Sequence, residues 1–164
     1  MNLKKVTLNF IVVFLIFLTD RLSKIYILKI AELENGVDIY VTQYLNFYLI
    51  WNKGIAFGLF AFNESFIYSV ITIVIFVITI IILVMILRNI GLKKYALLVV
   101  FSGSLGNLFD RIYYSAVPDF IDLHVKGYHW FVFNVADIFI TIGIILLIVD
   151  EAFFNNNKKD KNDV

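Results

Sequence analysis

The longest run without a charged residue covers residues 65–87, between Glu64 and Arg88. At about 1.5 Å per residue, an α-helix of this length crosses the roughly 30 Å hydrocarbon core of a bilayer. Composition agrees, because 61% of the 164 residues are hydrophobic and only 16% are charged. A soluble domain of this size could not bury so much apolar surface. The sequence therefore predicts an integral membrane protein.

Three further apolar stretches, at about residues 6–28, 95–112 and 130–149, are interrupted by polar residues. Together with residues 65–87 they predict a membrane all-α bundle of four transmembrane helices, in a single domain that covers the whole chain. The segment at about 31–64 alternates apolar and polar residues, so we expect short strands and a small extracytoplasmic β-sheet there. The first stretch also resembles a cleavable signal peptide, but no small-x-small cleavage site follows it.

Most lysine and arginine residues outside the predicted spans lie on one side of the bilayer. They precede the first span, connect the second to the third and follow the fourth, as is typical of short cytoplasmic segments. We therefore expect both termini in the cytoplasm and a multi-pass protein of the bacterial cytoplasmic membrane. The formal net charge of +1 indicates no nucleic-acid partner, and the absence of cysteine excludes disulfides and a thiolate metal site.

Polar residues inside the predicted spans indicate a site, because an ionisable group at the bilayer centre costs about 2.5–3.5 kcal/mol. Counted along the helices, Asp20 and Asp137 both lie roughly 8–10 Å below the outer edge of the bilayer. Asn107 and Arg111 reach the same outer layer, so polar residues of three spans converge. Helical spacing places three sets on one face each: Asp20 with Lys24, Gly103 with Asn107 and Arg111, and Asn134 with Asp137.

A purely structural role is the alternative for most of these residues. Asp20 and Lys24 would then form an internal ion pair. Gly103 would allow a close helix contact, and Arg111 would extend to the interface. Asp137 differs, because no cation lies one helical turn away from it. Two nearby carboxylates that share a proton can activate water and polarise a carbonyl, which is the chemistry of amide hydrolysis.

Five motifs follow one another along the chain. They are Asp20-Arg-Leu-Ser-Lys24, Asn52-Lys-Gly54-Ile-Ala-Phe-Gly58, Gly103-Ser-Leu-Gly-Asn107-Leu-Phe-Asp-Arg111, Val117-Pro-Asp119-Phe-Ile-Asp and Phe133-Asn134-Val-Ala136-Asp137. Each is weak alone, but their order and separations resemble the signature blocks of bacterial lipoprotein signal peptidases, the signal peptidase II family. The resemblance covers about residues 20–143.

This resemblance implies an intramembrane aspartyl endopeptidase that removes signal peptides from diacylglyceryl-modified prolipoproteins, cutting before the lipid-bearing cysteine. It implies that Asp119 and Asp137 are the catalytic pair. The residues implied for substrate binding or support are Asp20, Lys24, Asn52, Gly54, Gly103, Asn107, Arg111, Asn134 and Ala136. The expected partners are lipid-modified prolipoproteins and membrane lipid. We expect a monomer without cofactor or metal, its active site facing the extracytoplasmic side.

Several positions depart from the family pattern without removing a proposed catalytic group. An aliphatic residue is common at Pro118, a proline at Phe131 and a serine at Ile138. Because Pro118 fixes its own φ and favours an extended Val117, it affects how Asp119 is presented.

Three other interpretations remain open. His124 and His129 with Asp122 contain metal-ligand types, but their spacing in an outer loop is typical of solvent-facing side chains. Ser23 and Lys24 suggest a Ser/Lys peptidase, although neighbours on a helix point about 100° apart. A small transporter or channel subunit would also use intramembrane Asp and Lys, but the four spans contain no inverted repeat.

Overall fold

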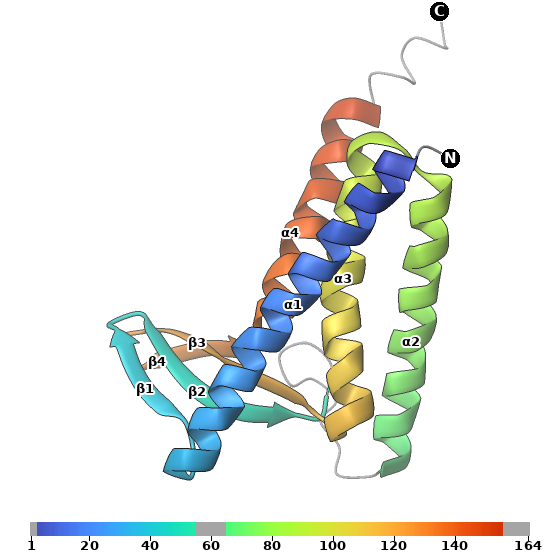
Figure 1. Ribbon diagram of the computed structural model, residues 1–164. Helices are drawn as coiled ribbons and strands as arrows, with labels where there is room; N and C mark the ends of the chain where they lie inside the picture. The colour runs from blue at the N-terminus through green and yellow to red at the C-terminus, as the bar shows by residue number, and fades with distance from the viewer. Residues whose placement is uncertain (1–2, 55–64, 156–164) are drawn as a thin grey trace, which may run out of the picture.

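The structure, a computed structural model, describes residues 3–54 and 65–155, and this part of the chain forms a helical bundle with a sheet at one end (Figure 1). Its helices are α1 (Leu3–Glu34), α2 (Ser65–Arg88), α3 (Gly91–Tyr114) and α4 (Val135–Val149), which a π-helical segment, η2 (Asp150–Asn155), extends. Helix α3 packs against the other three. The beginning of α1, the α2–α3 connection and η2 lie at the end of the bundle opposite the sheet.

The sheet is antiparallel, and its spatial order follows the chain. Its strands are β1 (Asp38–Thr42), β2 (Leu45–Asn52), β3 (Val117–Val125) and β4 (Tyr128–Phe133). Lys126 and Gly127 join β3 to β4 with φ values of 50° and 78°. Positive φ at both positions is what a two-residue type I′ hairpin turn requires, and glycine adopts it without steric cost.

The structure corrects several expectations about the bounds of helices and strands. Two strands lie within residues 31–64 as expected, but β3 lies between the third and fourth predicted spans and β4 extends into the fourth, so Asp119 lies in a strand. Residues 130–133 belong to β4, and the helix expected from residue 130 begins at Val135. A short apolar run does not distinguish a strand from a buried helix, and pairing with β3 decides in favour of the strand. Helix α1 also continues beyond residue 28, to Glu34.

Two small apolar clusters hold the elements together. Ile86 of α2 packs with Leu97 and Leu98 of α3 near the end opposite the sheet. Ile27 of α1 packs with Phe120 of β3 and with Val37, which lies between α1 and β1. The second cluster fixes the sheet against the bundle, and with it the strand that carries Asp119.

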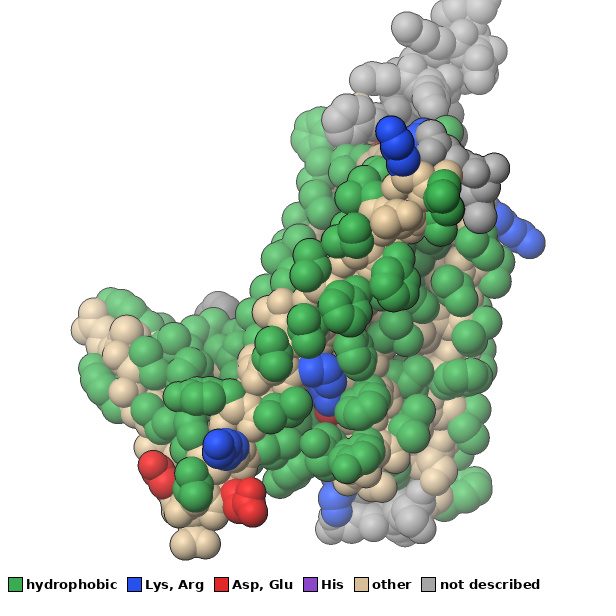
Figure 2. Space-filling view, viewed as in Figure 1, with side chains coloured by type: hydrophobic (Ala, Val, Ile, Leu, Met, Phe, Trp, Pro, Cys, Tyr) green, Lys and Arg blue, Asp and Glu red, His purple; other side chains and the backbone are tan. Residues whose placement is uncertain are grey.

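Most large apolar side chains of the helices point outward. Figure 2 shows hydrophobic side chains over the helical part of the visible face, with most charged side chains near its two ends. Helix α2 is the clearest case, because Ile73, Val77 and Ile81 are all exposed. Within residues 3–54 and 65–155, Phe66–Arg88 is the one helix that is long and apolar enough to cross a membrane. An apolar surface of this extent is typical of contact with lipid or another apolar partner.

Candidate active site

A buried group of four ionised side chains joins α1 to α3. Lys24 Nζ lies 3.0 Å from Asp20 Oδ2 and 2.6 Å from Asp110 Oδ2. Arg21 Nη2 lies 2.8 Å from Asp20 Oδ2 and 2.7 Å from Asp110 Oδ2, and its guanidinium packs over the ring of Phe109. Asp20, Lys24 and Asp110 are fully buried. Two carboxylates and two cations therefore compensate one another where a single charge would be costly.

The same group fixes the first turn of α4. Asp20 Oδ1 accepts a hydrogen bond of 3.0 Å from the backbone N–H of Ala136. Close helix packing makes this contact possible, because a Cβ atom at Gly106 would lie 2.6 Å from Asp20 Oδ2. A Cβ atom at Gly103 would lie 2.5 Å from the backbone oxygen of Ala136. Both glycines therefore allow α3 to approach its neighbours more closely than any other residue would.

Asn107 connects the ion pairs to Asp137. Its Oδ1 accepts a hydrogen bond of 2.9 Å from Lys24 Nζ, and its Nδ2 donates one of 2.8 Å to Asp137 Oδ1. These two bonds fix the orientation of the amide, since its oxygen faces a donor and its nitrogen faces an acceptor. The position of Asp137 thus depends on residues from α1 and α3.

Asn134 contacts both Asp119 and Asp137. It is the N-cap residue of α4 and forms a capping box with Asp137: its Oδ1 accepts from the N–H of Asp137 and its own N–H donates to Asp137 Oδ2. Its Nδ2 donates a hydrogen bond of 2.6 Å to Asp119 Oδ1. A strand-to-helix junction of one residue therefore brings the carboxyl group of β3 next to that of α4.

The second oxygen of Asp119 is held from β2. Asn52 Nδ2 donates to Asp119 Oδ2 at 2.8 Å, while Asn52 Oδ1 accepts from the N–H of Gly54 at the same distance. Arg111 in turn donates to the backbone oxygen of Gly54. Burial, and after it the negative charge of Asp137, raises the pKa of Asp119 to about 7, although the amides of Asn52 and Asn134 act in the opposite direction. A proton can therefore be held or released here near neutral pH.

A cavity of about 660 Å³ is bordered by both carboxyl groups. Its polar wall also includes Asn52, Asn107, Arg111 and Asn134, whereas isoleucines of α2 and α4 form much of the rest. A polar end with titratable groups and long apolar walls suits a substrate that is mostly apolar but carries a reactive polar bond. The arrangement can therefore place water and a peptide carbonyl between two carboxyl groups.

The structure brings together all the residues that the sequence predicted for the site. They are Asp20, Lys24, Asn52, Gly54, Gly103, Asn107, Arg111, Asp119, Asn134, Ala136 and Asp137. Gly58, which ends the second motif, lies outside the described residues. Sequence reasoning missed the partners Arg21 and Asp110, although both are ionisable residues in predicted spans and the same criterion would have selected them.

The structure also decides several alternatives. The Asp20–Lys24 ion pair and the close helix contact at Gly103 are both present. Arg111 does not extend to the interface, because only 5% of it is exposed. The Ser/Lys interpretation is wrong, since Ser23 Oγ donates to a backbone oxygen and Lys24 Nζ is surrounded by three acceptors.

Comparisons with known proteins agree on one family. Residues 12–153 match the family model described as signal peptidase (SPase) II. The chain is 55% identical over 162 residues to a lipoprotein signal peptidase of Pelagibacter ubique, covering 99% of this chain and 98% of the relative. It is 38% identical over 151 residues to a lipoprotein signal peptidase of Anaplasma phagocytophilum, covering 91% and 94% of the two chains.

The fold has a solved counterpart. A bacterial membrane enzyme determined by the in meso method at 2.3 Å resolution superposes with a TM-score of 0.72 and 28% sequence identity. The superposition covers 93% of this chain and 92% of the other. The four helices and the small antiparallel sheet therefore form an architecture already seen in a membrane enzyme.

Proposed function

Because the chain belongs to the signal peptidase II family, aspartic peptidases that cleave the signal peptides of prolipoproteins, we propose that Asp119 and Asp137 are its catalytic carboxyl groups. The observation that carries this assignment is the double contact of Asn134, which donates one hydrogen bond to each carboxyl group. Both groups also border the same cavity. Membership of this family removes the transporter alternative.

The two carboxyl groups have different surroundings, which suggests different roles. Asp137 accepts hydrogen bonds from the Asn134 backbone N–H and from the Asn107 amide, and it lies in the first turn of α4. Asp119 also accepts two N–H donors, so the helix N-terminus is what sets Asp137 apart. It favours a negative charge and makes Asp137 the base that receives the proton of water. The raised pKa of Asp119 makes it the acid that begins the reaction with its proton.

The reaction then proceeds in two balanced steps. A water molecule attacks the peptide carbonyl carbon while Asp137 takes one of its protons and Asp119 donates its own proton to the carbonyl oxygen. In the second step the carbon–nitrogen bond breaks, Asp137 delivers its proton to the leaving nitrogen and the hydroxyl proton returns to Asp119. Both carboxyl groups regain their starting states. Each must accept and donate a proton during the cycle, which an amide cannot do.

The remaining polar residues hold this pair in place. Lys24 and Asp20 act through Asn107 and Ala136, and so position the first turn of α4. Arg111 acts through Gly54, whose N–H is bound to the amide that holds Asp119. These are positioning residues, because their bonds reach the carboxyl groups through another residue.

Burial of the charged side chains supports a bundle of four spans. Asp20, Lys24 and Asp110 face one another inside the bundle, so α1 and α3 present apolar side chains outward despite their charges. Lipid could then contact all four helices. We place the sheet and both catalytic carboxyl groups toward the extracytoplasmic side. Reporter fusions near Asn35 and Lys126 should score outside and one near Asn89 inside, and an external score at Asn89 would overturn this topology.

The apolar walls of the cavity suggest how substrate is held. Ile75 and Ile78 of α2 face the cavity together with Ile138 and Ile142 of α4. An apolar signal peptide would lie along these walls, with the bond to be cut beside Asp119. We also propose that the chain cuts before a diacylglyceryl-modified cysteine. The acyl chains would lie in the neighbouring lipid phase while the peptide bond reaches the carboxyl groups.

The test is cleavage of a lipid-modified prolipoprotein by membranes that contain Asp119→Asn, Asp137→Asn or both changes. Each single variant should lose cleavage, and the double variant should lose little more, because the two groups act as a unit. Asp38→Asn is the matched control, since it neutralises an exposed carboxyl group at the start of β1. Substantial cleavage by either single variant at normal protein levels would show that the pair is misassigned.

A further inference from the structure

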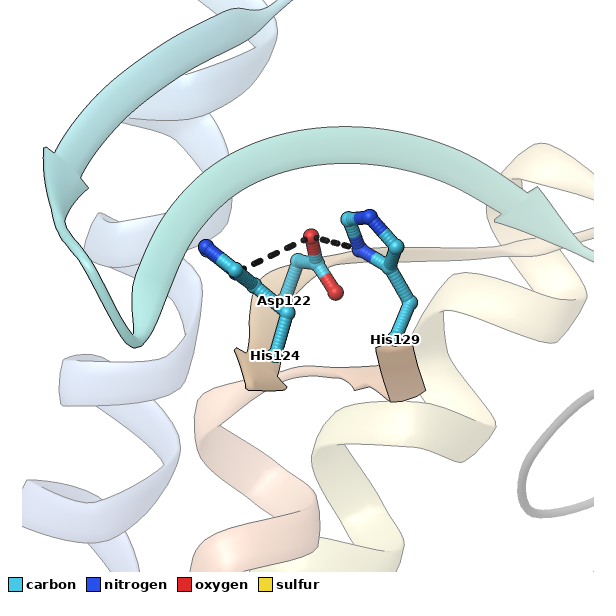
Figure 3. Close-up of side chains that lie close together, drawn as sticks. All are labelled: Asp122, His124 and His129. Atoms are coloured by element: carbon cyan, nitrogen blue, oxygen red, sulfur yellow. Dashed lines mark hydrogen bonds and ion pairs between the residues drawn. The ribbon is translucent and has the colours of Figure 1, made fainter. Parts of the chain in front are cut away.

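A separate cluster of metal-ligating side chains lies on the β3–β4 hairpin. Figure 3 shows the carboxylate of Asp122 between the imidazoles of His124 and His129. Asp122 Oδ2 is 2.7 Å from His129 Nδ1 and 3.7 Å from His124 Nδ1. One ligand atom from each residue lies within 4.8 Å of the other two. We propose that these three side chains bind a divalent transition-metal ion of the Zn²⁺ type.

A β-bulge creates the cluster. The β3–β4 register pairs Leu123 with Phe131 but His124 with His129, so Trp130 is left without a partner in the ladder. In an unbroken ladder His124 would face Trp130, and His129 would point to the opposite side of the sheet. The extra residue turns His129 to the side that carries His124. The sequence expectation of solvent-facing histidines is wrong for His124, whose side chain is only 11% exposed.

The hydrogen bonds of the cluster are incomplete. Asp122 is 2% exposed, yet its Oδ1 has no hydrogen-bond partner among the described residues, and neither has His124 Nδ1. Within residues 3–54 and 65–155, the ion-pair contacts of Asp122 are with the two histidines, and no lysine or arginine pairs with it. A buried carboxylate beside a free ring nitrogen is costly without a compensating positive charge. A bound cation would use both atoms.

The donor set and the available space fit Zn²⁺. Two imidazole nitrogens and one carboxylate oxygen are ligands that zinc accepts, with a water molecule in the fourth position. Zinc–ligand bonds of about 2.0–2.2 Å place tetrahedral ligand atoms roughly 3.3–3.6 Å apart, so only small side-chain movements are needed. A cavity of about 420 Å³ borders Asp122 and His129, and the buried Oδ1 of Asn46 faces the same region without a partner. Asn46 lies opposite Asp122 in the β2–β3 ladder, where its oxygen could accept from the bound water.

The site lies on the hairpin that carries the proposed catalytic elements, because β3 contains Asp119 and β4 ends at the residue before Asn134. A metal ion between β3 and β4 would resist separation of these strands. We therefore expect the ion to stabilise the folded protein, independently of whether the carboxyl pair performs the cleavage.

The experiment measures Zn²⁺ binding by the purified full chain in detergent. Any histidine tag is removed, because the chain has only two histidines and those of a tag would dominate the binding signal. Metal content after dialysis against Zn²⁺ and competition with a fluorescent zinc indicator give stoichiometry and affinity. The variants are Asp122→Asn, His129→Ala and the double change His124→Ala with His129→Ala. Glu34→Gln is the charge control, since this exposed carboxylate ends α1 near the sheet.

We expect one zinc ion per wild-type chain and a higher Tm when Zn²⁺ is added. Each single variant should lose about tenfold or more in affinity, and the double variant should lose both the binding and the rise in Tm. His129 is 56% exposed at its side chain, so His129→Ala keeps the test valid even if the other changes impair folding. Absence of saturable binding by the wild type, or equal binding by wild type and His129→Ala, would overturn the proposal. The cluster would then be a hydrogen-bonded Asp–His pair that links the two strands.

Discussion

The change Asp119→Asn should alter stability in opposite directions at acid and alkaline pH. Burial raises the pKa of Asp119 from its ordinary value of 3.8 to about 7. Since the folded protein holds this proton more tightly than the unfolded chain, the contribution to stability is complete below about pH 4 and is lost as the pH rises through about 7. A difference of about three pKa units corresponds to about 4 kcal/mol in the free energy of unfolding. The asparagine variant cannot ionise and avoids this loss.

The amide also carries a cost of its own. Asp119 accepts a hydrogen bond at each oxygen, from Asn52 and from Asn134, whereas an asparagine side chain has a single acceptor atom. Neither neighbouring side-chain amide can flip without losing a bond that its own oxygen accepts. The Asn52 oxygen accepts from the N–H of Gly54, and the Asn134 oxygen accepts from the N–H of Asp137. One N–H therefore loses its partner, at about 1–3 kcal/mol. The variant should be less stable than wild type near pH 4 and more stable near pH 8.5.

Thermal unfolding in detergent at the two pH values measures this reversal. The chain has two tryptophans and nine tyrosines but no cysteine, so intrinsic fluorescence is the suitable signal rather than a thiol-reactive dye. A swing of about 4 kcal/mol corresponds to roughly 10 °C in the difference between the two Tm values. Asp38→Asn serves as the exposed control and should show no such swing. A Tm difference between Asp119→Asn and wild type that is equal at both pH values would refute the reasoning.

Three other changes test the positioning residues. Gly103→Ala should lower the free energy of unfolding by about 1–3 kcal/mol, because the new Cβ atom would meet the backbone oxygen of Ala136 and push α3 away from α4. An unchanged Tm would contradict this close approach of the two helices. Lys24→Met should lower the free energy of unfolding by about 3–5 kcal/mol, because it leaves buried carboxylate charge uncompensated. The measurement is the yield of folded protein and its Tm, and normal values of both would argue against a charged network. Arg111→Lys should reduce Tm and cleavage together, because lysine lacks the guanidinium Nη2 that donates to the Gly54 oxygen. Full stability with no cleavage would instead make Arg111 catalytic.

Local patterns in the sequence were sufficient for much of the fold and the site. The charge-free run at 65–87 predicts α2 almost to its ends, because helix length and apolar composition are properties of neighbouring residues. The depth estimate placed Asp20 and Asp137 in one layer, and in the structure Asp20 binds the first turn of the helix that carries Asp137. The two residues lie close together because charges in apolar spans must face inward, although the count for Asp137 assumed a helix from residue 130, where the structure has β4.

Tertiary structure decided the features that depend on contacts between distant segments of the chain rather than on a residue and its sequence neighbours. Arg21 and Asp110 lie 89 positions apart, and only the packing of α1 on α3 makes them an ion pair. The start of α4 at Val135 depends on the pairing of β4 with β3, since the same apolar residues could have continued a helix.

Asn134 and His129 show the same limit most clearly. Helical spacing placed Asn134 on one face with Asp137, but its position as N-cap of α4 depends on where β4 ends, and its bond to Asp119 exists only because β3 and α4 meet there. His129 faces Asp122 because a single extra residue shifts the strand register, and side-chain direction in a strand reverses with each position. Spacing along the chain determines which residues share a helix face, whereas strand register and helix packing determine which residues from distant segments meet.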